Sequence, residues 1–117
     1  MVRVLRSLLG RIGLRDVEDA SDARAALEMM RTLHYDLLIT DYNMAGMNGY
    51  DLLREVRTDP RLEMTPVLLM TADPSVTRFI KETDLTQCLI KPFSAEMLKA
   101  KIQHLLSLDA GAASPGR

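Results

Sequence analysis

Three polar residues each follow a short apolar run, and their side chains could together handle a phosphoryl group. These residues are Asp41, Thr71 and Lys91. A carboxylate can accept a phosphoryl group as an acyl phosphate, an ammonium group can neutralise its oxygens, and a hydroxyl can donate a hydrogen bond to them. Taken singly, Asp41 could instead cap a loop, Thr71 could be an ordinary strand-end residue and Lys91 a surface lysine. Taken together, the three favour phosphoryl chemistry.

The apolar runs in front of these residues predict short buried strands. Four strands are expected, at residues 16–20, 37–40, 66–70 and 87–90. Runs without polar alternation are typical of parallel strands that are covered on both faces. Because the carboxyl ends of parallel strands meet at one edge of a sheet, we expect the three polar side chains to share a crevice there.

The apolar residues between the strands recur at helical spacing and predict five helices. These are expected at residues 1–13, from a cap at Ser21 or Asp22 to Leu33, from Gly49 to the break at Asp59-Pro60, around Val76–Ile80, and from a cap at Ser94 to about Leu108. Strands that alternate with helices predict an α/β fold with a parallel sheet and right-handed crossovers. Residues 1–108 are expected to form the domain, and residues 109–117 a flexible C-terminal tail.

The composition describes one domain and argues against several classes of partner. The chain has 117 residues, 47% of them hydrophobic and 26% charged, and a formal net charge of −1, which gives no support to a nucleic-acid or membrane partner. Its one cysteine, Cys88, cannot form an internal disulfide, and two histidines complete no zinc-ligand spacing. A reducing cytoplasm fits this composition. An Arg-rich targeting presequence at the N-terminus is the alternative to an amphipathic core helix there.

The order and spacing of the polar residues resemble those of a known family. Thr71 follows Asp41 by 30 residues (71 − 41), and Lys91 follows Thr71 by 20 (91 − 71). The segment DYNMAGMNG begins at Asp41, and Lys91 begins the motif Lys-Pro-Phe. From Met1 to about Leu108 the chain resembles a CheY-like receiver domain of a two-component response regulator. This resemblance implies a flavodoxin-like parallel sheet with helices on both faces.

The resemblance also implies a role for each site residue. Asp41 would be the phosphoacceptor, Thr71 the switch hydroxyl and Lys91 the residue that pairs with the phosphate. Magnesium would be held by the Asp41 carboxylate and the main-chain carbonyl of Asn43. The peptide bond before Pro92 would be cis, as is feasible for an X-Pro bond.

The chain departs from the family pattern at three places. It begins at the helix that normally follows a first strand ending in two acidic residues, so we expect an N-terminally truncated fold of about four strands and five helices. Magnesium would then be weakly held, because the two acidic ligands are missing. The missing central strand would leave a gap in the sheet, which a homodimer or a shift of the neighbouring strand would fill. The alternative is that the start codon is assigned too late. Cys88 occupies the usual position of the switch aromatic, and Ala45 that of a loop proline.

The expected function is that of a stand-alone response regulator, not of an enzyme beyond self-phosphorylation and self-dephosphorylation at Asp41. It would accept a phosphoryl group from a histidine kinase or a phosphotransfer protein and signal to a downstream protein by direct contact. The alternative is a degenerate receiver that has lost magnesium-dependent phosphorylation and acts as a dimerisation or interaction module.

Overall fold

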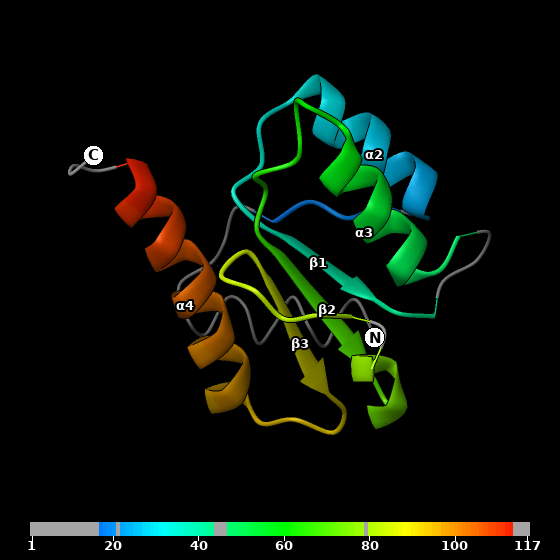
Figure 1. Ribbon diagram of the computed structural model, residues 1–117, viewed down its shortest axis with the longest axis vertical. Coiled ribbons are helices and arrows are strands. Elements are labelled where there is room, and N and C mark those ends of the chain that lie inside the picture. Colours follow the sequence, from blue (N-terminus) through cyan, green and yellow to red (C-terminus); the bar gives the residue numbers. More distant parts are fainter. Residues whose placement is uncertain (1–16, 21, 44–46, 79, 114–117) are drawn as a thin grey trace.

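The computed structural model describes residues 17–20, 22–43, 47–78 and 80–113 (Figure 1). Helices and strands alternate along this part of the chain. In order they are α2 (Ala23–Thr32), β1 (Leu38–Asp41), α3 (Gly49–Thr58), β2 (Val67–Thr71), the 3-10 helix η1 (Pro74–Arg78), β3 (Thr86–Ile90) and α4 (Ala95–Ala113). None of the described helices is long and apolar enough to cross a membrane.

The three described strands form one parallel sheet in the order β1-β2-β3. Leu38 pairs with Val67 and Asp41 with Met70 across the first interface. Across the second interface the register places Thr71 opposite Ile90. All five residues of β2 are buried, because this strand has a neighbour on each side and a helical layer on each face. This burial explains its uninterrupted apolar sequence.

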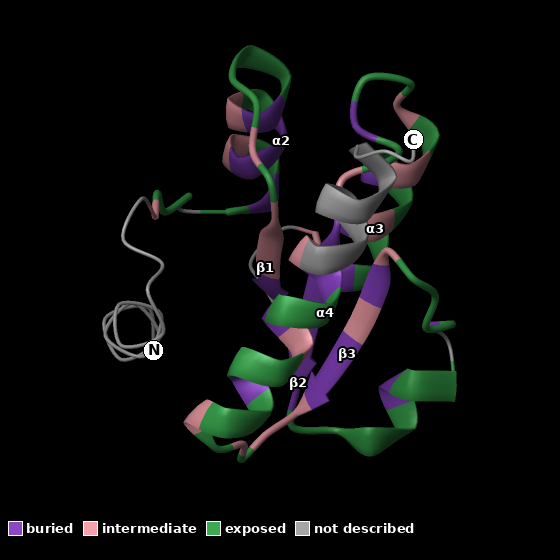
Figure 2. Ribbon diagram, turned by 90° about the vertical axis from the view of Figure 1, so that its left-hand side faces the viewer, coloured by how far each residue is buried: buried purple, intermediate pink, exposed green. Residues whose placement is uncertain are grey.

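Each face of the sheet is covered by helices, as Figures 1 and 2 show. Val67 and Leu69 of β2 pack in one apolar cluster with buried residues of α2 and α3. Leu68 and Met70 point to the opposite face and pack in a second cluster with buried residues of α4. Successive strand residues alternate between the faces, so one short strand supplies both halves of the core. The flavodoxin-like arrangement expected from the sequence is confirmed.

Polar side chains cap the three α-helices, and two of these caps, Asp22 and Ser94, are among the residues that the sequence predicted. The carboxylate of Asp22 accepts a hydrogen bond from the Ala25 N–H at 2.8 Å. Asn48 caps α3 through the Asp51 N–H, and Ser94 Oγ accepts from the Met97 N–H at 3.1 Å. Each cap satisfies a donor that the first helical turn leaves unpaired.

The structure corrects two of the expected elements. No strand is present at Val17–Ala20, so the described residues contain three strands rather than about four. Glu18, Asp19 and Ala20 are exposed and are residue types that are depleted in strands. The expected fourth helix is the 3-10 turn η1.

The two ends of the chain complete the comparison with the expected elements. The first expected helix, at residues 1–13, lies outside the described residues. Helix α4 runs on past Leu108 to Ala113, so it includes the first residues of the expected tail.

Candidate functional site

The three predicted site residues stand at the carboxyl-end edge of the sheet, on three neighbouring strands. Asp41 ends β1, Thr71 ends β2 and Lys91 directly follows β3. The ladder continues just beyond the strands, because the Tyr42 N–H donates to the Met70 carbonyl and the Lys91 N–H to the Thr71 carbonyl, each at 2.7 Å. Backbone hydrogen bonds therefore set the relative positions of the three residues.

Asp41 and Lys91 form an ion pair between the Lys91 ammonium Nζ and the Asp41 carboxylate Oδ1. The two side chains are partly buried, with 29% of Asp41 and 25% of Lys91 exposed. Oδ1 is shielded from solvent and accepts no hydrogen bond from the described residues, so the lysine supplies its compensating charge. The Asp41 side chain is exposed in part, so the carboxylate is reachable from solvent at this edge. The predicted meeting of acid and amine is present.

Thr71 is buried at the same edge, with 2% of its surface exposed. Its Oγ1 accepts a hydrogen bond from the Asp73 N–H at 3.0 Å. A hydroxyl can accept one hydrogen bond and donate another, so the Thr71 proton can still be given to an anion.

Asp73 lies near the same edge, but its carboxylate is used locally. Oδ1 accepts hydrogen bonds from Ser75 Oγ at 2.7 Å and from the Ser75 N–H at 2.9 Å. These bonds to Ser75 hold the pKa of the Asp73 carboxyl below its usual value. Asp73 therefore caps η1 from the position directly before it.

Cys88 is a core residue in the described structure. It pairs with Leu69 in the sheet, and its side chain packs in the same apolar cluster as Leu69 and Val76. Its N–H donates to Glu82 Oε2 at 2.7 Å. Burial, and then the nearby Glu82 carboxylate, raise the pKa of the Cys88 thiol to about 11. The thiol is therefore protonated at neutral pH.

Gly49, which the sequence analysis named only as the last residue of the DYNMAGMNG segment and the start of a helix, is also a positioning residue. A Cβ atom built on it would lie 2.8 Å from Tyr42 Cα and 2.9 Å from the Asp41 carbonyl oxygen. Its N–H donates to the Tyr42 carbonyl at 2.6 Å. Only a glycine lets the first turn of α3 approach the end of β1 this closely. The signal in the sequence is a glycine directly after the Asn48 cap.

The residues expected around a metal and at the proline are placed as follows. Asn43 lies two residues beyond the end of β1 and is exposed, while Ala45 lies outside the described residues. Among the residues that the structure describes, no group of three or more His, Cys, Asp or Glu side chains could hold a metal ion. The Lys91–Pro92 peptide bond is cis, as predicted.

Comparison with known proteins points to the same family throughout. Residues 1–103 match the family of the response regulator receiver domain. The chain is 39% identical over 107 residues to the chemotaxis protein CheY of Pseudomonas aeruginosa, covering 90% of this chain and 86% of that protein.

Solved structures share the fold. The signal receiver domain of a signal transduction histidine kinase from Syntrophus aciditrophicus is 29% identical, with a TM-score of 0.81, and the match covers 97% of this chain and 85% of that one. The receiver domain of a sensor histidine kinase from Pseudomonas aeruginosa is 23% identical, with a TM-score of 0.79 over 91% of this chain and 88% of that one. That structure has a magnesium ion coordinated in its active-site cleft.

Proposed function

The chain belongs to the response regulator receiver domain family, and on that premise we propose that Asp41 accepts a phosphoryl group from a histidine kinase or a phosphotransfer protein. The observation that carries this proposal is the ion pair between Asp41 and Lys91. It joins a nucleophile to a cation at the edge of a parallel sheet, where such folds place their chemistry.

The reaction is a transfer between two nucleophiles. A carboxylate oxygen of Asp41 attacks the phosphorus in line, and a new P–O bond forms as the P–N bond of the donor phosphohistidine breaks. The bonding electrons return to the donor imidazole, which takes a proton from solvent. Lys91 stays protonated and pairs with the phosphoryl oxygens, and Thr71 donates its hydroxyl proton to one of them. The protein supplies position and charge.

A magnesium ion would be held by the Asp41 carboxylate and the Asn43 main-chain carbonyl. Both donors are oxygens, which is the ligand type that magnesium prefers. Because Asp41 is the single carboxylate named here as a ligand, the site would be weak and water would complete the coordination. When bound, the ion would neutralise charge on the phosphoryl oxygens. Lys91 already supplies one positive charge at this position, so we propose that millimolar magnesium is needed for full activity.

The test is to incubate the protein with a small acyl phosphate and millimolar magnesium and to measure its intact mass. We expect one phosphoryl adduct, absent from Asp41→Asn and formed more slowly by Lys91→Gln. Asp51→Asn, which changes a carboxylate on the exposed side of α3, is the matched control and should behave like the wild type. An unchanged mass for the folded wild-type protein would contradict the proposal.

A non-phosphorylated interaction module is the second candidate, and the position of Cys88 favours it. The thiol is packed in the core, so no aromatic side chain is available at this position to respond to phosphorylation of Asp41.

Output by contact with a downstream protein, cytoplasmic location and a homodimer stay predictions. Within the described part of the chain β1 is an edge strand, the kind of surface that can pair with a second copy, and light scattering measures the oligomeric state directly.

A further inference from the structure

A pocket lies at the opposite edge of the sheet from Asp41, between the end of α2 and the turn that follows α3. Its volume is about 240 Å³. The residues around it come from segments 30–35 and 61–65, which lead into the first residues of β1 and β2. The pocket is therefore separate from the phosphoacceptor edge, where the same strands end.

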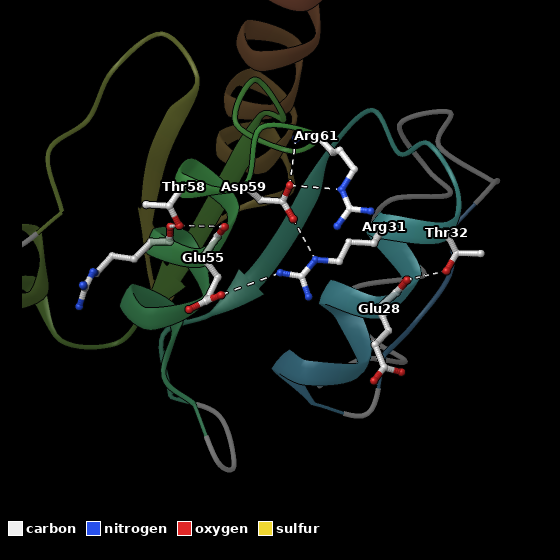
Figure 3. Close-up of polar contacts among 8 residues, drawn as sticks. Glu28, Arg31, Thr32, Glu55, Thr58, Asp59 and Arg61 are labelled. Carbon is white, nitrogen blue, oxygen red and sulfur yellow. Dashed lines mark hydrogen bonds and ion pairs between the residues drawn. The ribbon is translucent and has the colours of Figure 1, made fainter.

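Two arginines, Arg31 and Arg61, line the pocket, and none of the described residues that line it is acidic. Asp59, just outside, holds both of them, as Figure 3 shows: Arg31 Nε lies 2.9 Å from Oδ2 and Arg61 Nε lies 3.4 Å from Oδ1. Because each arginine uses Nε for this contact, its terminal amino groups are left for another acceptor. Arg31 Nη2 also lies 3.9 Å from Glu55 Oε1, at the limit of an ion pair. Asp59 thus orients two guanidinium groups before any ligand arrives.

The wall of the pocket favours an anion over a cation. It carries two guanidinium groups and no carboxylate among its described residues, while the two acids that pair with the arginines, Asp59 and Glu55, are not part of the lining. Because these acids and the carboxyl end of α2 offset the positive charge, recognition depends on the hydrogen-bond donors of the guanidinium groups and not on a surplus of charge. Guanidinium groups also match the planar oxygens of a carboxylate or phosphate.

The other lining residues indicate that the ligand has an apolar part, and the pocket volume limits its size. Met30 and Leu62 are buried and apolar, while Leu33 is 59% exposed at the rim. At about 240 Å³ the pocket is smaller than the roughly 300 to 1,000 Å³ of sites for drug-sized molecules. We propose that this pocket, with Arg31 and Arg61 on its wall, binds a small molecule that carries a carboxylate or phosphate group on a short aliphatic frame.

The experiment is calorimetric titration of the full chain with succinate and, separately, with inorganic phosphate. We expect millimolar or tighter binding of at least one probe, which also identifies the preferred anion. Arg61→Gln should weaken it roughly tenfold or more, the usual scale for a lost hydrogen bond to a charged group. The Arg61 side chain is 67% exposed, so this variant is expected to fold.

Two further variants test the location of the site. Leu33→Glu adds a negative charge at the rim and should abolish binding. Arg54→Gln, the matched control, removes an exposed arginine of α3 that lies over the Tyr50 ring at 5.9 Å and outside the pocket, and it should bind like the wild type. No binding of either probe, equal weakening by Arg54→Gln, or loss of binding in Lys91→Gln instead of Arg61→Gln would each overturn the inference.

Discussion

At the scale of single residues, Arg57 is a cation whose partners within the described part of the chain are neutral oxygens. Its guanidinium donates to the backbone carbonyls of Glu63, Thr65 and Leu85 and to Thr86 Oγ1, at 2.7 to 3.1 Å. Burial lowers the pKa of Arg57, yet an arginine stays charged at any ordinary pH. One planar group on α3 thereby satisfies acceptors in two different loops, at the amino ends of β2 and β3.

We expect Arg57→Lys to lower the free energy of unfolding by roughly 1 to 3 kcal/mol, because a single ammonium cannot reach all four acceptors, three of them in part-buried contacts. Urea unfolding followed by circular dichroism measures the loss. Arg54→Lys, an exposed change on the same helix, should have an effect close to zero. Equal stability of the two variants would show that the four hydrogen bonds contribute little.

At the scale of elements, the polar contact between α2 and α3 depends on Asp59. This residue ends α3, and its carboxylate accepts from the Arg61 N–H at 2.9 Å as well as pairing with Arg31 of α2. These partners, the Arg61 N–H first and then the Arg31 side chain, lower the pKa of the Asp59 carboxyl from 3.8 to about 2. The connection between the two helices therefore requires an ionised carboxylate.

The pH dependence of this contact between the helices follows from the direction of the pKa shift of Asp59. A lowered pKa in the folded state stabilises the fold above the unfolded pKa of 3.8, and this contribution is lost as the pH falls toward about 2. We expect Asp59→Asn to be less stable than the wild type at neutral pH. The difference should shrink between about pH 4 and pH 2 in urea titrations at each pH. A difference that stays constant down to pH 2 would exclude the ion pairs as its source.

At the scale of the whole molecule, the two apolar clusters share β2 and make one cooperative unit. Leu69 belongs to the cluster with α2 and α3, and its neighbour Leu68 to the cluster with α4. Cys88 is part of the first cluster, and it is the chain's single thiol. Exposure of this thiol therefore requires the core itself to open.

We expect the native protein to react very slowly with a thiol reagent at pH 8, because the buried thiol has a pKa of about 11 and only the thiolate is nucleophilic. Adding urea should raise the labelling rate in step with the loss of helical circular dichroism. The unfolded chain provides the control for full reactivity. Rapid labelling without denaturant would mean that β3 opens independently of the rest of the core.

The features that the sequence predicted are those encoded by periodicity. The runs at 37–40, 66–70 and 87–90 correspond to β1, β2 and β3 with boundaries shifted by at most one residue, and the polar residue behind each run lies at the site edge. Apart from the meeting of the strand ends, contacts that join distant segments could not be predicted. Arg57 reaches Leu85 across 28 residues, and Arg31 reaches Asp59 across the same separation. Neither pair leaves a periodic signal. The prediction of a strand at Val17–Ala20 was wrong, since Glu18, Asp19 and Ala20 are exposed and belong to residue types that are depleted in strands.

The edge that carries Asp41, Thr71 and Lys91 is assembled from three stretches of chain that are far apart in sequence. No contiguous fragment shorter than the span from Asp41 to Lys91 contains all three groups, and even that fragment lacks the α2 and α4 layers that hold the strands together. Chemistry that needs the complete trio is thus confined to finished molecules. Under the proposed function, a nascent or clipped copy that lacks one of the three groups would therefore not sustain the full phosphoryl-transfer reaction at Asp41.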